Sequence, residues 1–258
     1  MKCTVQVCGL DTRKPRLTFE LVLMKFVERE NEILRTVRRL REENLDFIVV
    51  GGYAVSALAR HRFSVDCDLV VPKEGRARFE EVLKRDGFSK HVQKTGFDAA
   101  YGGEFISYVK KVDGLPVTVD LLVGSLVCRA TEASWSFDYI RRFSVAASIP
   151  GYGFSVDCRI PERELLIAFK LHSGRRADVR DFVVLRENVD RGKVLKHLRR
   201  GDEARLKGQI AAVLRALEDE NLVDSLKGVF TIEAAVVKLI DNAKKDLHNL
   251  VKGLKLTF

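Results

Sequence analysis

A short apolar run that ends in two glycines most constrains the fold of this 258-residue chain. Phe47-Ile48-Val49-Val50 is typical of a buried strand, and Gly51-Gly52 closes it. A short helical segment follows, so the glycines stand at a strand-to-helix turn where the backbone can approach a ligand closely. The first N–H groups of such a helix point outward. This turn therefore predicts an anion-binding site.

Two carboxylates follow on the next predicted strand. Asp66 and Asp68 are two residues apart, so both face the same side of that strand. They repel each other unless a cation lies between them, and hard oxygen ligands of this kind suit Mg²⁺ or Mn²⁺. A later strand carries Asp120 in an apolar or β-branched run, where an unpaired charge is costly. Beside the first two acids it would complete a three-carboxylate cluster; a solvent-facing position at a strand edge is the alternative.

Periodicity organises the rest of the chain around this motif. It predicts helices over 19–43, 53–60, 73–86, 131–141, 162–174, 178–188, 203–220 and 231–252. It predicts strands over 47–50, 67–71, 142–149 and 154–160, and a β meander over 88–123 with a hairpin turn at Asp113-Gly114. We therefore expect an N-terminal helical segment at 1–44, an α/β core at 45–160 and a C-terminal helical subdomain at 161–258. No linker rich in proline or serine separates these parts, so we expect them to pack together.

Composition excludes some classes of protein and suggests a partner. With 46% hydrophobic and 31% charged residues, the chain is neither disordered nor collagen-like. Its net charge is +9, and segment 170–215 alone holds 13 basic and 6 acidic residues. A basic segment of this kind suggests a polyanion, with nucleic acid as the first candidate. A solvated helical surface explains the same charge equally well.

Neither a membrane span nor a disulfide framework is expected. No apolar run approaches the ~18 residues that span a bilayer, and the N-terminus lacks a signal-peptide layout. A cytoplasmic location and no membrane partner are therefore expected. The odd number and scattered positions of the cysteines predict reduced thiols, with one disulfide as an alternative in a hot-adapted cytoplasm. They are Cys3, Cys8, Cys67, Cys128 and Cys158.

The glycine and acid motifs resemble those of the nucleotidyltransferase (DNA polymerase β-like) superfamily. The form Gly51-Gly52-Tyr53-Ala54, then Arg62-x-Ser64-x-Asp66-x-Asp68-Leu69, is most similar to AbiEii-type toxins and related minimal nucleotidyltransferases. A second block, Lys170 … Arg175-Arg176-Ala177-Asp178-Val179-Arg180-Asp181, is similar to a Lys … Arg … Lys/Arg-Asp-x-x-Asp segment of those proteins. The resemblance covers roughly residues 45–187. Cys67 departs from the apolar residue usual at its position, but it packs as a small hydrophobe.

The resemblance implies a fold and a role for each matched residue. The fold is α+β, a nucleotidyltransferase-fold mixed β-sheet with flanking helices and a C-terminal helical subdomain. Asp66 and Asp68 would bind both metal ions, and Asp120 the ion that activates the attacking hydroxyl. The nucleotide triphosphate would be bound by Gly51, Gly52, Arg62, Ser64 and Lys170. A surface charge on a loop is the alternative for Arg62, and an ordinary helix charge is the alternative for Lys170. Three further residues would either contact and position these nucleotide-binding groups or only stabilise the helical cap: Asp178, Asp181 and Arg175.

The activity implied is Mg²⁺-dependent transfer of NMP from an NTP to an acceptor hydroxyl, with release of pyrophosphate. The basic segment favours RNA, and the AbiEii-type resemblance favours the 3′ end of tRNA and admits a cognate antitoxin as a partner. Transfer to a small molecule or to a protein side chain is an alternative. A nucleotide- or nucleic-acid-binding module without turnover is another.

Four further residues could have either a structural role or a role in the site. Phe154-Ser155-Val156-Asp157-Cys158 repeats the sequence around Asp66, but Arg159 replaces the second acid, so we interpret Asp157 as structural. His172 is expected to be a hydrogen-bonded scaffold residue. Tyr53 and Phe63 could stack on a base, although core packing is the preferred interpretation of Phe63.

Overall fold

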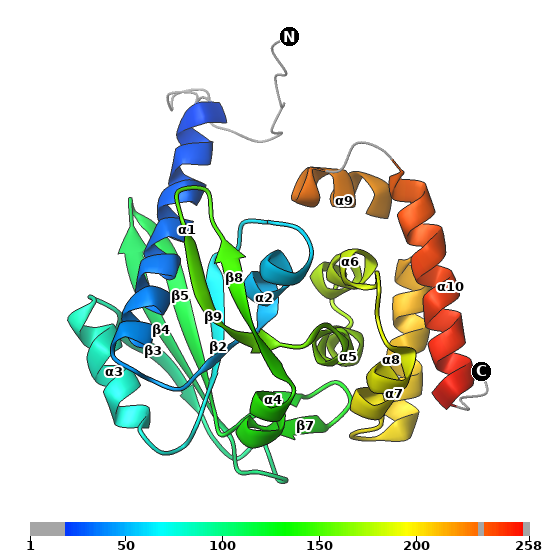
Figure 1. The fold of residues 1–258 in the computed structure, drawn as a ribbon, viewed down its shortest axis with the longest axis horizontal. Coiled ribbons are helices and arrows are strands. Elements are labelled where there is room, and N and C mark those ends of the chain that lie inside the picture. The colour runs from blue at the N-terminus through cyan, green and yellow to red at the C-terminus, as the bar shows by residue number, and fades with distance from the viewer. Residues whose placement is uncertain (1–18, 232–234, 255–258) are drawn as a thin grey trace.

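The computed structural model describes residues 19–231 and 235–254 as an α+β fold (Figure 1). Its helices are α1 (Phe19–Glu42), α2 (Gly51–Leu58), α3 (Arg76–Arg85), α4 (Phe137–Arg142), α5 (Arg163–Ser173), α6 (Arg176–Leu185), α7 (Arg191–Leu198), α8 (Glu203–Ala216), α9 (Leu222–Phe230) and α10 (Val236–Leu254). Its strands are β1 (Ile48–Val49), β2 (Asp66–Val71), β3 (Ser89–Lys94), β4 (Glu104–Val112), β5 (Leu115–Val123), β6 (Ser125–Cys128), β7 (Ala133–Ser136), β8 (Ser144–Pro150) and β9 (Ser155–Pro161). The predicted class, a mixed sheet with flanking helices followed by helices, is confirmed.

The central sheet has the strand order β1-β2-β5-β4-β3. β2 and β5 pair in parallel, and every other pair in this sheet is antiparallel. The predicted hairpin turn joins β4 to β5, with Asp113 at φ 49° and Gly114 at φ 78°. Strands β6–β7 and β8–β9 form two separate two-stranded sheets.

The two faces of the central sheet differ in character. On β2 and β5, Cys67, Leu69, Val119 and Leu121 are at most 1% exposed and lie on the face that α1 covers. Because side chains alternate along a strand, the residues between them face the opposite side. The sheet is thus apolar toward α1 and carries its acids on the other face.

The helices after residue 161 pack together beside the sheet rather than over it (Figure 1). α5 is at their centre, because it contacts α6, α7 and α8 as well as β6 and β9. α2 contacts α5 and α6, so the short helix after the glycine turn joins the sheet to the helical part.

The predicted helix over 131–141 is wrong for its first half. Glu132 has φ 57° and turns the chain, and Ala133–Ser136 pairs with Ser125–Cys128 as an antiparallel hairpin. The side chain of Trp135 is fully buried, with its ring 4.8 Å from that of Phe169 on α5. Packing against α5 therefore outweighs the local helical periodicity of this segment.

The remaining general expectations concern membranes and thiols. Among the described residues, every helix is too short or too polar to cross a bilayer. Cys67, Cys128 and Cys158 are free thiols, as predicted, and Cys3 and Cys8 lie outside the described residues.

A buried carboxylate anchors the loop between β3 and β4. Asp98 is 4% exposed and accepts hydrogen bonds from the backbone N–H groups of Ala100, Tyr101 and Gly103. The Ser125 hydroxyl also donates to it. Burial acts to raise the pKa of Asp98, but these hydrogen bonds outweigh it and lower the pKa below its ordinary value.

We predict that Asp98→Asn lowers the free energy of unfolding by about 2 kcal/mol, because a charged acceptor is lost. The lowered pKa means that the ionised form stabilises the fold above about pH 4, and this contribution disappears as the pH falls further. Urea unfolding of wild type and Asp98→Asn, from neutral pH to below about pH 4, measures the effect. Asp157→Asn is the control, since the Asp157 side chain is 76% exposed. Equal losses in the two variants would contradict the prediction.

Candidate active site

The glycine turn forms the first turn of α2 rather than preceding it. Val50 is extended, and the helix begins at Gly51, two residues before the predicted start. Gly51 has φ +66°, and a Cβ on it would lie 2.1 Å from Oδ2 of Asp68. Glycine is therefore required here twice, for the backbone conformation and for the space that the carboxylate occupies.

The parallel pairing of β2 with β5 brings the predicted acids together. Asp68 is the Cα partner of Asp120, and Asp66 is the partner of Thr118. Both aspartates of β2 and Asp120 therefore share the face opposite α1. Asp120 lies half-buried on the central strand of the sheet, so the alternative of a solvent-facing edge is wrong.

Two hydroxyl groups that the sequence analysis did not single out hold these carboxylates. Ser107 on β4 is paired with Asp120 and donates to its Oδ1 over 2.6 Å. Thr118 donates to Oδ1 of Asp66. The Asp68 carboxylate has no hydrogen bond or ion pair with any residue of the described ranges.

The electrostatics of this face favour a cation. Burial, aided by the neighbouring carboxylates Asp68 and Asp66, raises the pKa of Asp120 to about 6 against the opposing Ser107 hydrogen bond. Burial also raises the pKa of Asp68, and Lys170 opposes this only in part. Neighbouring carboxylates repel each other when they are all ionised, and a hard divalent ion bound between them stabilises their ionised forms.

The residues present fit a divalent ion by donor type and by electrostatics. Within 19–231 and 235–254, however, no three His, Cys, Asp or Glu side chains already form a metal site. Asp66 and Asp120 are instead turned toward the Thr118 and Ser107 hydroxyls. The strand register places the carboxylates on one face, and side-chain rotation would be needed to converge them.

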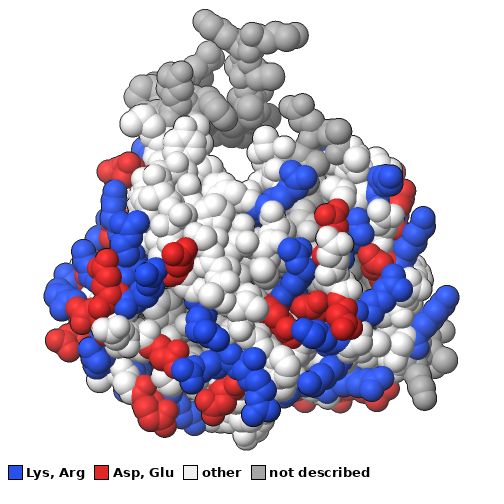
Figure 2. Space-filling model, viewed as in Figure 1, with Lys and Arg blue, Asp and Glu red and all other residues white. Residues whose placement is uncertain are grey.

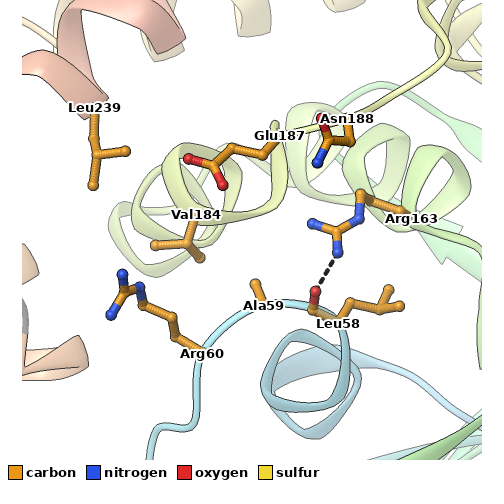
Figure 3. A pocket seen from close by; sticks show the side chains of 8 residues that line it. All are labelled: Leu58, Ala59, Arg60, Arg163, Val184, Glu187, Asn188 and Leu239. Atoms are coloured by element: carbon orange, nitrogen blue, oxygen red, sulfur yellow. Dashed lines mark hydrogen bonds between the residues drawn. The ribbon is translucent and has the colours of Figure 1, made fainter.

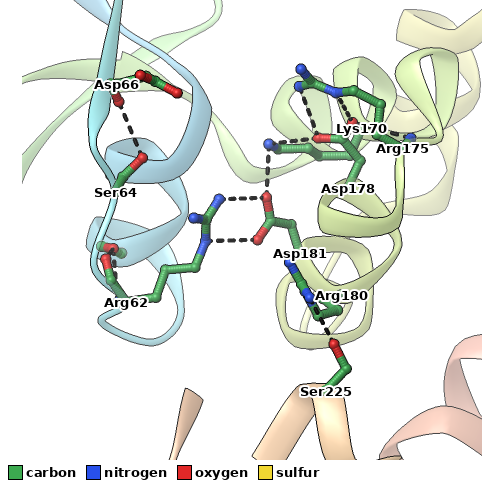
Figure 4. Close-up of polar contacts among 10 residues, drawn as sticks. Arg62, Ser64, Asp66, Lys170, Arg175, Asp178, Arg180, Asp181 and Ser225 are labelled. Carbon is green, nitrogen blue, oxygen red and sulfur yellow. Dashed lines mark hydrogen bonds and ion pairs between the residues drawn. The ribbon is translucent and has the colours of Figure 1, made fainter. Parts of the chain in front are cut away.

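A buried ion network faces these acids from the helical side (Figure 4). The Arg62 guanidinium binds both carboxylate oxygens of Asp181, at 3.0 and 3.1 Å. The Lys170 ammonium lies 2.8 Å from Asp181 and 3.0 Å from Asp178. Both of these carboxylates are 1% exposed, so their charges depend on these cations.

Counted by formal charge, the network carries one excess positive charge. Burial acts to raise the pKa of Asp178, but Lys170 and Arg175 outweigh it and lower the pKa to about 2. Burial acts to lower the pKa of Lys170, but Asp181 and Asp178 outweigh it and raise the pKa. Three cations, including Arg175, therefore share two carboxylates. Asp178 and Asp181 fix the helical cap and also hold the cations that border the site.

Arg62 and Ser64 cover the start of α2. A Cβ on Gly52 would lie 2.9 Å from Nη2 of Arg62 and 3.0 Å from Oγ of Ser64. A guanidinium and a hydroxyl thus lie beside the first turn of α2, and anion binding there stays a prediction. Tyr53 is 1% exposed and donates to the Ser64 carbonyl, so base stacking by Tyr53 is wrong.

The structure agrees with the interpretations of His172 and Asp157 but not with that of Phe63. His172 is fully buried and donates through Nε2 to the Leu198 carbonyl while Nδ1 accepts from Thr131, and burial lowers its pKa to about 4. Asp157 lies exposed on β9. Phe63 is partly buried and packs on Phe26, which is 39% exposed, with ring centroids 5.8 Å apart, so core packing of Phe63 is not confirmed.

Comparison with known proteins gives distant structural similarity. No family model and no curated protein matches the chain. JHP933 from Helicobacter pylori has 15% identity and a TM-score of 0.42, over 89% of this chain and 93% of that one. ANT(2″)-Ia, solved in complex with adenylyl-2″-tobramycin, has 16% identity and a TM-score of 0.41, over 70% of this chain and 97% of that one. At these identities and TM-scores, neither likeness assigns an activity to this chain.

We predict that Gly51→Ala destabilises the protein more than Gly75→Ala. Both glycines have positive φ, so both variants incur roughly 1–2 kcal/mol of backbone strain. Only Gly51→Ala also displaces the Asp68 carboxylate, which adds about 1–3 kcal/mol of overpacking, whereas no atom lies within 4 Å of a Cβ at Gly75. Urea unfolding measures both. Equal destabilisation would mean that Asp68 does not lie against Gly51.

We predict that Asp120→Asn stabilises the protein at neutral pH when divalent ions are removed by EDTA. Because the pKa of Asp120 is raised to about 6 in the folded state, the native protein binds more protons than the unfolded chain between about pH 4 and 6. Wild-type stability therefore falls as the pH rises through this range. The variant should be more stable by about 1–3 kcal/mol at pH 7 and by nothing at pH 4.

Urea unfolding at both pH values checks this prediction. Asp157→Asn, at an exposed carboxylate, is expected to show no gain at either pH. Equal stability of wild type and Asp120→Asn at neutral pH would contradict the charge repulsion inferred for this face.

Proposed function

We propose that this protein is an enzyme, a nucleotidyltransferase that transfers NMP from an NTP to an acceptor hydroxyl and releases pyrophosphate. The register of β2 and β5 is the observation that carries the proposal, because it sets Asp68 directly beside Asp120 and keeps Asp66 on the same face. The anion-binding start of α2 lies against this face, since Gly51 touches Asp68. Acids for a cation and donors for a phosphate are thus adjacent.

The triphosphate would be held at the start of α2. The N–H groups of Gly51 and Gly52 bind phosphate oxygens together with the Arg62 guanidinium and the Ser64 hydroxyl. Lys170 has three N–H donors and uses two on Asp178 and Asp181, which leaves one for a phosphate oxygen. The excess charge of the ion network favours an anion here.

Asp66, Asp68 and Asp120 would hold Mg²⁺ or Mn²⁺. When bound, the metal neutralises phosphate charge and makes the acceptor hydroxyl easier to deprotonate. The acceptor oxygen forms a bond to the α-phosphorus while the bond from that phosphorus to the β-phosphate oxygen breaks, and pyrophosphate leaves. Oδ2 of Asp120, which Ser107 leaves free, accepts the hydroxyl proton.

The acceptor we propose is RNA, specifically the 3′ end of tRNA. The side chains of Arg175 and Arg176 are 75% and 80% exposed at the start of α6, where Arg175 reaches the ion network beside the site. On the face shown in Figure 2, basic and acidic side chains are intermixed, so the basic excess does not form a continuous patch there. The arginines near the site are therefore the groups that favour a polyanionic acceptor. The AbiEii-type resemblance supports tRNA and a cognate antitoxin as partners.

We predict that incubation with each α-labelled NTP, Mg²⁺ and total tRNA transfers label to tRNA. Asp68→Ala is expected to abolish transfer, because the partner of Asp120 in the carboxylate pair is lost. Asp157→Ala is the matched control: it removes an aspartate from the same five-residue sequence, at an exposed position of β9, and should keep full activity. Gel electrophoresis of the labelled RNA measures transfer.

The other outcomes separate the alternatives. Label on the protein itself would replace RNA with a protein side chain as the acceptor. Transfer that depends on added small hydroxylated molecules, and does not weaken with salt, would replace it with a small molecule. NTP binding without transfer to any acceptor, or full activity of Asp68→Ala, would overturn the proposed reaction.

A further inference from the structure

A cavity lies at the opposite end of α2 from the glycine turn. Its volume is about 320 Å³, within the roughly 300–1,000 Å³ range of small-molecule sites. It is lined by Leu58, Ala59, Arg60, Arg163, Val184, Glu187, Asn188 and Leu239. The eight residues of α2 span about 12 Å at 1.5 Å per residue, so this cavity is separate from the carboxylate face.

The two arginines of this cavity have different tasks. Arg163 donates to the carbonyl of Leu58 at the end of α2 and to the carbonyl of Leu185 at the end of α6. It thus satisfies two helix C-termini whose partial negative charge would repel an anion. Arg60 is exposed and forms no hydrogen bond or ion pair with the described part of the chain. Its guanidinium is available for a ligand.

The two arginines of the lining stand at opposite ends of the cavity (Figure 3). Asn188 lies at the same end as Arg163, and Val184, Ala59 and the carboxylate of Glu187 lie between the two ends. The Asn188 amide can both donate and accept, and it makes no hydrogen bond within the described ranges. Glu187, which is exposed, accepts hydrogen bonds only.

A nucleotide matches these features together. Its phosphate would pair with the free guanidinium of Arg60, since charge-assisted bonds from arginine to phosphate are strong. Its base has apolar faces for Val184 and Leu239, and an edge of donors and acceptors for Asn188 and Glu187. A small carboxylate would satisfy Arg60 but would leave the apolar groups and the far end unused.

We propose that this cavity is a second nucleotide-binding site. The nucleotide would come either from solution, as a mononucleotide, or from an RNA strand bound across the helical part. The site shares no residue with the carboxylate face, so it would bind a nucleotide whether or not the chain transfers one.

Photolabelling tests the proposal directly. We expect 8-azido-AMP to label peptides that contain residues 58–60, 184–188 or 239, and excess AMP to protect them. Arg60→Glu should reduce this labelling about tenfold, because one charge-assisted bond to phosphate is lost. Arg60 has no partner in the described ranges, so the variant should unfold at the wild-type temperature.

Arg142→Glu is the matched control, because it makes the same charge change at an exposed side chain of α4 that has no partner in the described ranges and lies outside the cavity. A 4-thiouridine RNA oligonucleotide tests the second source. Labelling by 8-azido-AMP identifies a free nucleotide, and labelling by the RNA alone identifies a bound strand; either supports the site. Labelling confined to peptides of residues 63–68 or 116–123 with both probes, or equal labelling of Arg60→Glu and wild type, would overturn it. Cavity labelling that persists in Asp68→Ala would show this site independently of the transfer reaction.

Discussion

The parallel pairing of β2 with β5 is the constraint on which the candidate active site depends. It is the only parallel pair in the described central sheet, and its register alone sets Asp68 beside Asp120. A shift by one residue would turn Asp120 toward α1, into the layer formed by Cys67 and Leu69, where an ionised group is very costly. The apolar residues that alternate with the acids therefore fix the register, so the packing against α1 also determines the chemistry of the opposite face.

The ion network then fixes the helical part against that face. Arg62 is on the loop between α2 and β2, and Lys170 and Asp181 are on α5 and α6, so one buried cluster joins three elements. Buried ion pairs of this kind contribute little net stability because both charges lose water, but breaking one leaves a charge without a partner. The network therefore disfavours other arrangements of the helices more than it stabilises this one. It also keeps cations beside the acids without neutralising Asp68, whose pKa remains raised.

Features of this arrangement that depend on residues close together in the sequence were predictable. Contacts between residues far apart in the sequence were not. The glycine turn, the two acids of β2 and the alternation along β5 are local patterns, and the structure contains all of them. The contact from Arg62 to Asp181 joins residues 119 positions apart, and the hydroxyl of Thr118 meets Asp66 across 52 positions. No local pattern specifies such partners. The error at 131–141 has the same origin, since the burial of Trp135 against α5 is a tertiary effect.

Helices α2 and α6 connect the two candidate sites. Both begin beside the ion network, where their N-terminal N–H groups favour an anion, and both end at the cavity, where their C-terminal carbonyls oppose one. An anion in the cavity therefore requires that the partial negative charge of these carbonyls be compensated, whereas an anion beside the ion network does not. Arg163 supplies it by binding both terminal carbonyls, and because those bonds occupy its guanidinium, a second cation is required to bind a phosphate. Arg60 is that cation. The need for it explains why an arginine without a partner in the described structure lies at the edge of a cavity that already contains Arg163.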